Sequence, residues 1–263
     1  MRKRINKEKK MVKRISVVCI VALLVVSMTG VLTHAMDMKG KIGFGGYGGY
    51  SILNPAAFNE HLDVIKGWYE GWWDFGPDSG TVTPLTGGIR YGGEIRYGLT
   101  SNLIVGAGYS KMSGSGQVNW DDDWGWTGEQ KATLAVTGFT GSLLFAMGSE
   151  SSNFYFGGGA GSYSGKITRT ASDSYDWMGW WDSVVYQGIS TIGFHAIAGF
   201  EYFLSNNIAF AVEGMYSSVI FPGEWTIIEC PDAWRIGDIS TEWDEPVQAG
   251  GVTIGTGFHF YVG

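Results

Sequence analysis

The chain has 263 residues, of which 42 are glycine, 15% are aromatic and only 16% are charged. The aromatic content excludes a disordered chain, and glycines without a period of three exclude collagen. Eight of the 18 lysines and arginines lie in the first 35 residues. The remaining chain is strongly acidic, which excludes nucleic acid as a partner, because phosphate binding needs basic side chains.

Residues 1–35 have the pattern of an export signal. A basic stretch ends at Arg14, an apolar run extends from Ile15 to Val26, and Thr33-His34-Ala35 resembles a signal-peptidase site. We therefore predict a signal peptide at 1–35 and one exported domain at 36–263. An uncleaved membrane anchor is the alternative, and Met11 is a second possible start. Cys230 is the only cysteine after residue 35, so no internal disulfide is expected, and its role stays open.

From residue 36 onward, apolar and polar residues alternate between turn signals, as in β-strands. In residues 88–99, for example, Ile89, Tyr91 and Ile95 share one face, and Arg90 and Glu94 share the other. Tight polar turns at 99–102, 148–152 and 205–207 alternate with long segments near 53–87, 114–130, 171–186 and 222–246. The pattern predicts eight strands, at residues 41–52, 88–99, 103–113, 131–147, 153–169, 187–204, 208–221 and 247–262.

The first long segment contains a helix signal. Asn54 is a good N-cap and Pro55 a good first residue. Three apolar side chains then recur at helical spacing before Gly67, where we expect the helix to end: Phe58, Leu62 and Ile65. Such a helix would lie on the outer leaflet, plug the mouth of a barrel or pack on its own loop.

These features predict an all-β fold: an eight-stranded antiparallel transmembrane up-and-down β-barrel with short periplasmic turns and long extracellular loops. A sheet in lipid must close, because an open edge would leave backbone groups unpaired. The interior of eight strands is just wide enough for side chains to fill. Charged residues on the inward face would form an interior ion-pair network, which we assign to Lys41, Arg90, Glu94, Arg96, Glu201 and Glu213. His195 and His259 share this face and are expected to be hydrogen-bond partners there.

The signal peptide, the turn Tyr97-Gly-Leu-Thr-Ser-Asn-Leu103 and the closing Gly257-Phe-His-Phe-Tyr-Val-Gly263 resemble the small outer-membrane β-barrel proteins of Gram-negative bacteria. This group includes the membrane domain of OmpA, OmpX and OmpW. The resemblance covers residues 36–263 and implies location in the cell outer membrane, contact with its lipid and lipopolysaccharide, and insertion by the barrel assembly machinery. Members usually finish on an aromatic residue, whereas Val262 and Gly263 follow Tyr261 here.

All 12 tryptophans fall in the long segments, three in each, with many acidic residues around them. The plain interpretation is an aromatic girdle at the membrane interface with solvating acids. The alternative is a platform that binds glycans, divalent cations or another surface. We assign this platform to Trp120, Asp121, Asp122, Asp123, Trp124, Trp177, Trp180 and Trp181.

Three functions remain open from the sequence. The first, which we favour, is a structural or surface-interaction barrel with a closed interior. The second is a narrow channel or a conduit for small or hydrophobic solutes. The third is a barrel enzyme acting on lipid A, with His61 as the residue to test, although no catalytic spacing is evident. No cofactor or metal is predicted, because no set of Cys and His supports zinc and the Asp121–Asp123 run lacks the calcium-loop spacing. A soluble lipocalin-like barrel is the alternative fold.

Overall fold

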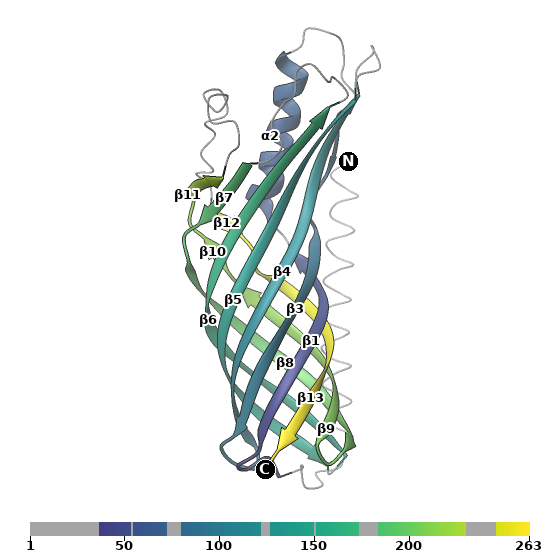
Figure 1. Cartoon of the computed structure of the whole chain (residues 1–263), viewed down its shortest axis with the longest axis vertical. Coiled ribbons are helices and arrows are strands. Elements are labelled where there is room, and N and C mark those ends of the chain that lie inside the picture. The colour runs from purple at the N-terminus through teal and green to yellow at the C-terminus, as the bar shows by residue number, and fades with distance from the viewer. Residues whose placement is uncertain are drawn as a thin grey trace, which may run out of the picture.

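The computed structural model describes residues 37–53, 55–72, 80–121, 127–149, 151–173, 184–229 and 246–263. The predicted signal peptide and the N-cap at Asn54 lie outside these residues. Within them, β-strands dominate and form one closed barrel (Figure 1).

The barrel has eight antiparallel strands, each hydrogen-bonded to the next around the circle. They are β1 (Ile42–Leu53), β3 (Gly87–Gly98), β4 (Leu103–Asp121), β5 (Thr127–Ser149), β6 (Ser152–Asp173), β8 (Thr191–Ser205), β9 (Ile208–Ser218) and β13 (Gly251–Val262). The first and last strands pair from Ile42↔Val262 to Leu53↔Gly251, which closes the sheet. The predicted eight-stranded barrel is confirmed.

Three strands are much longer than predicted. β4 and β5 continue through most of the segment 114–130, and β6 extends to Asp173, into the segment 171–186. Both segments were predicted as loops. The three strands form a raised wall at one side of the barrel (Figure 1). Short strands extend this wall, because β2 (Thr81–Thr83) pairs with β4, β7 (Val184–Gly188) with β6, and β11 (Trp225–Glu229) with β7. Separately, β10 (Ile220–Phe221) pairs with β12 (Val247–Gln248). The predicted strands 187–204, 208–221 and 247–262 are therefore each interrupted.

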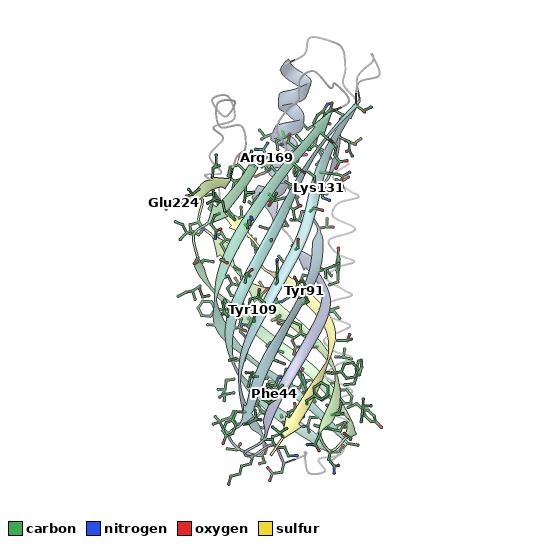
Figure 2. The ribbon with its side chains drawn as sticks, viewed as in Figure 1. Phe44, Tyr91, Tyr109, Lys131, Arg169 and Glu224 are labelled. Atoms are coloured by element: carbon green, nitrogen blue, oxygen red, sulfur yellow. The ribbon has the colours of Figure 1, made fainter. Side chains whose placement is uncertain are left out.

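The outer surface carries a band of exposed apolar side chains on all eight strands. Tilted strands of about 11 residues cover the apolar band of roughly 25 Å that such barrels present to lipid. Above it, the outward positions of β4, β5 and β6 become polar and carry Lys111, Lys131 and Lys166; Tyr109 and Lys131 mark the two levels in Figure 2. The apolar band includes Phe44, Tyr50, Ile95, Tyr97, Tyr109, Phe139, Phe145, Phe156, Phe194, Phe200, Val212, Tyr216, Ile254 and Phe258.

One helix, α2 (Ala56–Trp72), follows β1 and stands at the raised end of the barrel (Figure 1). The carbonyl of Pro55 accepts the first helical hydrogen bond from Asn59. The helix does not end at Gly67 as predicted but continues for more than a turn, to Trp72. In the part of the chain that the structure describes, no helix is long and apolar enough to cross a membrane.

The predicted apolar face of α2 is buried inside the raised end, as a plug. Phe58 and Leu62 are fully buried, and Ile65 nearly so. They belong to one cluster, called the upper apolar core, with inward side chains of the wall and of the mouth: Leu53, Leu85, Met112, Val118, Leu134, Val136, Tyr163, Ile167, Tyr186, Val219, Phe221, Trp225 and Val247. A second buried cluster lies near the turns, with Met38, Ile104, Leu144, Tyr155, Phe203 and Tyr261 among its members. The interior is therefore apolar towards both ends.

Candidate functional site

Arg96 is the centre of a buried polar cluster in the lower half of the barrel. Its side chain points inward from β3 and is 1% exposed. The guanidinium lies 2.5 Å from Glu94 Oε1 and donates to Glu201 Oε1 at 3.0 Å and to Glu213 Oε2 at 3.2 Å. The ring of Tyr155 lies 4.4 Å below its Cζ atom, a cation–π distance. The cluster thus joins strands β3, β6, β8 and β9 across the lumen.

His259, on β13, links the carboxylates of this cluster. Its Nδ1 lies 2.6 Å from Glu201 Oε1 and its Nε2 lies 2.8 Å from Glu94 Oε1. Carboxylate oxygens only accept, so both ring nitrogens donate when the ring is doubly protonated. Tyr261 donates to Glu201 at 2.8 Å, and Tyr155 donates to Glu213 at 2.9 Å. We call these seven residues the Arg96 network: Glu94, Arg96, Tyr155, Glu201, Glu213, His259 and Tyr261.

Inward-facing glycines make the space that the large side chains of this network occupy. A Cβ atom on Gly43 would lie 2.7 Å from the Tyr261 ring, and one on Gly45 would overlap the His259 ring. A Cβ on Gly199 would overlap the Tyr155 ring. These glycines therefore have a local physical role, because each of these rings takes the place of a Cβ atom on a neighbouring strand.

The structure brings four of the six predicted network residues together and leaves two apart. Glu94, Arg96, Glu201 and Glu213 are in contact, as described. Lys41 is half-buried at the turn end before β1, and among the described residues it forms no ion pair. The prediction for Lys41 is wrong, because strand alternation does not extend into the turn that precedes β1. Arg90 points inward but lies in a different layer.

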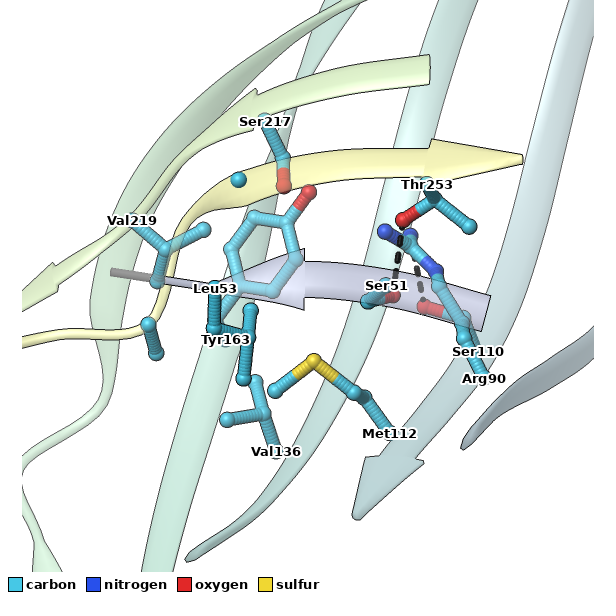
Figure 3. A pocket seen from close by; sticks show the side chains of 12 residues that line it. Ser51, Leu53, Arg90, Ser110, Met112, Val136, Tyr163, Ser217, Val219 and Thr253 are labelled. Atoms are coloured by element: carbon cyan, nitrogen blue, oxygen red, sulfur yellow. Dashed lines mark hydrogen bonds between the residues drawn. The ribbon is translucent and has the colours of Figure 1, made fainter. Parts of the chain in front are cut away.

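Arg90 lies in a small cavity between the Arg96 network and the upper apolar core. Its side chain is 5% exposed, and its Nη2 donates to Ser110 Oγ at 3.0 Å. The cavity measures about 20 Å³, room for one water molecule. Figure 3 shows the Arg90 guanidinium beside Ser51 and Thr253, whose hydroxyls are 2.8 Å apart. Close by, His195 on β8 is buried, and its Nε2 lies 2.9 Å from Ser142 Oγ.

At the raised end, a second polar contact holds the plug in place. Asn59 of α2 donates from Nδ2 to the carbonyl of Leu85 at 3.0 Å and accepts from the Leu85 amide at 2.8 Å. His61 lies on the same helix, half-buried. Burial, together with the nearby charge of Arg169, lowers the pKa of His61 to about 4. His61 is thus neutral at neutral pH, in a position where a positive charge would be unfavourable.

The predicted aromatic platform falls largely outside the described residues. Asp122, Asp123, Trp124, Trp177, Trp180 and Trp181 are all outside, and Asp121 ends β4. Trp120 is on β4, not in a loop as predicted, and it is half-buried and packs against the upper apolar core. Trp225 also lies in a strand and is buried. For these two tryptophans the sequence assignment to loops is corrected. Among the described side chains, no group of three or more is arranged to hold a metal ion.

Tyr155 and Tyr261 belong to the network although neither was predicted as a member from the sequence. Both are at least 99% buried and donate to carboxylates. The available signal was their position: each occupies an inward place on its strand, two residues from another buried polar side chain, Asn153 or His259. A buried tyrosine needs a partner for its hydroxyl, so inward tyrosines at the level of charged residues are candidates for such a network.

Comparison with known proteins identifies the family of the chain. The sequence matches the family described as outer membrane protein beta-barrel domain over residues 20–260. No curated protein sequence matches the chain. Among solved structures, it is similar to the outer membrane protein OprG of Pseudomonas aeruginosa, with 15% identity, 87% of this chain and 98% of that chain covered, and a TM-score of 0.48.

Two further solved structures are similar in the same way. Neisserial surface protein A is 8% identical, with 84% of this chain and 97% of that chain covered and a TM-score of 0.46. The attachment invasion locus protein Ail of Yersinia pestis, solved with the heparin analogue sucrose octasulfate, is 14% identical, with 86% and 100% covered and a TM-score of 0.37.

Proposed function

Since the chain belongs to the outer-membrane β-barrel protein family and resides in the cell outer membrane, we propose that it is a closed, non-enzymatic barrel that acts through its extracellular face. The observation that carries this proposal is the filled interior. The lumen is occupied by the Arg96 network at one level and by the upper apolar core at another. A water path would have to cross both levels.

The energetics of the two levels support a closed state at rest. Opening the lower level would separate Arg96 from three carboxylates in a buried site, and breaking a buried pair by losing one partner costs about 3–5 kcal/mol. Opening the upper level would expose Phe58 and Leu62, at about 1.5–3 kcal/mol for each buried side chain. These independent barriers support a sealed barrel rather than a fluctuating pore.

The histidines support a role other than catalysis. His195 and His259 are buried in the barrel interior, and His61 is half-buried in the plug. Among the described residues, none of the three lies exposed at the rim, where lipid or peptide substrate would approach. The proposed contacts of the extracellular face are with lipopolysaccharide, with divalent cations that bridge its phosphates, or with glycans, through the acidic tryptophan-rich segments.

Conductance across a planar bilayer tests the closed state. We expect the folded protein to give no current steps, whereas an open porin reconstituted in the same way provides the positive control. Regular steps from the native protein would contradict the proposal. Removal of residues 55–72 alone is expected to leave the bilayer sealed, because the Arg96 network stays in place.

The surface role is tested separately by tryptophan fluorescence. The native protein in vesicles that contain lipopolysaccharide is titrated with Ca²⁺, and we expect a saturable change in emission. Replacement of Asp122 and Asp123 by asparagine should raise the Ca²⁺ concentration at half-maximal response at least tenfold. Asp63→Asn, on the exposed side of α2, should leave this concentration unchanged. An unchanged response in the double variant would remove these acids from the proposal.

A second candidate function is a conduit for small hydrophobic solutes. It is favoured by the apolar lining of the raised end and by the fact that one helix, held through Asn59, fills it. Uptake of a small apolar solute into vesicles distinguishes the two functions. Uptake by the native protein that increases when residues 55–72 are removed would support the conduit, and no uptake would support the sealed barrel.

A further inference from the structure

Arg90 is a buried cation without a neighbouring anion. Among the described residues, no carboxylate lies within ion-pair distance of its guanidinium, whereas Arg96 has three. The guanidinium has five N–H donors, and Nη2 donates to the Ser110 hydroxyl at 3.0 Å. Its Nε is buried and has no partner. Burial of an unpaired charge costs several kcal/mol, so buried charges are normally compensated.

The cavity that Arg90 enters is built from donors and apolar groups. The residues around it include no aspartate or glutamate. Hydroxyl groups line one part, and aliphatic side chains or methionine line the rest, as Figure 3 shows. The hydroxyl-bearing residues are Ser51, Ser110, Tyr163, Ser217 and Thr253. Ser51 and Thr253 are hydrogen-bonded to each other, so one of these two hydroxyls donates to the other. The remaining hydroxyls can turn their hydrogens towards a negative charge, so such a lining suits an anion and gives a cation no charged ligand.

The size of the cavity restricts the ligand. A volume of about 20 Å³ holds one water-sized particle, which excludes phosphate esters, sugars and fatty acids. A monatomic anion fits and requires no second charge from the wall. We propose that this cavity is a binding site for a small monovalent anion of the size of chloride, held by the Arg90 guanidinium and the surrounding hydroxyls.

The main competing explanation is compensation at longer range. With His259 doubly protonated, the Arg96 network carries three carboxylates against two cations, and Arg90 would balance the excess charge from the layer above. This arrangement would leave the N–H groups of Arg90 to water. The two explanations differ in what happens when Arg90 is replaced by an apolar side chain of similar length.

The experiment measures unfolding of the full chain, purified from outer membranes in an uncharged detergent. Urea is the denaturant, because guanidinium chloride would supply the anion. Sodium chloride replaces sodium gluconate at constant ionic strength, since gluconate is too large for the cavity. For the native protein we expect a saturable rise of about 1 M in the urea midpoint at chloride far above its Kd. Sodium bromide should act in the same way.

Arg90→Met is the test variant and Lys111→Gln the matched control, because Lys111 is an exposed, outward-facing cation on the adjacent strand. We expect Arg90→Met to lose the chloride response and to be at least as stable as the native protein in gluconate. Lys111→Gln should keep the response. A chloride response in Arg90→Met equal to that of the native protein would overturn the proposal. So would an equal loss of stability in both salts, which would identify Arg90 as the counter-charge of the network.

A second measurement does not depend on any variant. The relaxation of ³⁵Cl in solutions of the folded native protein should show excess line width that bromide removes by competition and that heat unfolding abolishes. Absence of a saturable excess would overturn the proposal even if Arg90→Met failed to fold.

Discussion

Replacement of Gly45 by alanine should disrupt the Arg96 network although Gly45 is not one of its seven residues. The added methyl group would occupy the place of the His259 ring. The ring has no free direction of retreat, because Glu201 and Glu94 hold its two nitrogens at 2.6 and 2.8 Å. Either the ring leaves at least one carboxylate or the backbone of β1 moves.

The expected cost follows from these two routes. Loss of one hydrogen bond to a charged group costs about 1.5–3 kcal/mol, and overpacking a filled interior costs about 1–3 kcal/mol. Replacing a glycine in a strand by alanine stabilises the folded state by about 0.5–1 kcal/mol, because the unfolded chain has less conformational freedom. After this gain is subtracted, either route leaves a net cost, and we expect Gly45→Ala to lower the free energy of unfolding by about 1–2 kcal/mol.

Gly48→Ala is the matched control on the same strand, since a Cβ there has nothing within 4 Å. It should be neutral or slightly stabilising. Both variants are unfolded in urea, and the compact barrel is quantified by its gel mobility without boiling. The same substitution in a His259→Ala background should cost less than 1 kcal/mol, because the clashing ring is gone. Equal stability of Gly45→Ala and Gly48→Ala would refute the steric argument.

Three other predictions follow from the plug and the lipid face. Asn59→Ala should increase hydrogen exchange of α2 by about 10-fold or more, because the two hydrogen bonds to Leu85 are lost; equal exchange in the variant and the native protein would contradict this. The pKa of His61 is about 4 when folded and 6.5 when free, so α2 should be fully docked above pH 6.5. As the pH falls towards 4, α2 should become progressively less protected from hydrogen exchange, and His61→Gln should remove this pH dependence. Val212→Lys, in the middle of the lipid face, should cost about 2–4 kcal/mol, whereas Ser164→Lys above the band should cost almost nothing; the measurement is the urea midpoint in lipid vesicles.

The barrel could be predicted from the sequence because lipid on one side and a packed interior on the other impose a strict alternation. The same alternation identified the inward direction of Arg96 and Glu201. The extensions of β4 to β6 were missed because their inward positions include glycines, such as Gly114 and Gly116, which hide the alternation. The continuation of α2 past Gly67 was missed for a different reason, since an isolated glycine is tolerated inside a helix and is a weak stop signal.

The site could be predicted only in part. Alternation along a strand shows which side chains point into the barrel, but not at which height along the barrel axis they meet side chains of other strands. Arg90 and Arg96 are both inward on β3 and six residues apart, so they occupy different layers, and nothing in a single strand shows which carboxylates reach which layer. That information depends on the register between strands distant in sequence, such as Gly45↔His259 and Gly45↔Glu94. Trp120 was misplaced because a tryptophan beside acids is equally typical of a loop and of the end of a long strand.

The Arg96 network also has a consequence for the order in which the molecule is assembled. Its charged groups come from β3, β8 and β9, but the imidazole that links two of the carboxylates and the phenol of Tyr261 come from β13. Until the C-terminal strand pairs with β1, Glu94 and Glu201 lack the imidazole that links them, and Glu201 also lacks the hydroxyl of Tyr261. Completion of the polar interior and closing of the seam are therefore one event. A sheet in which the last strand is still unpaired gains little stability from this part of the core. Pairing of the last strand should therefore add stability in one step, which favours release of the finished barrel into lipid over release of an incomplete one.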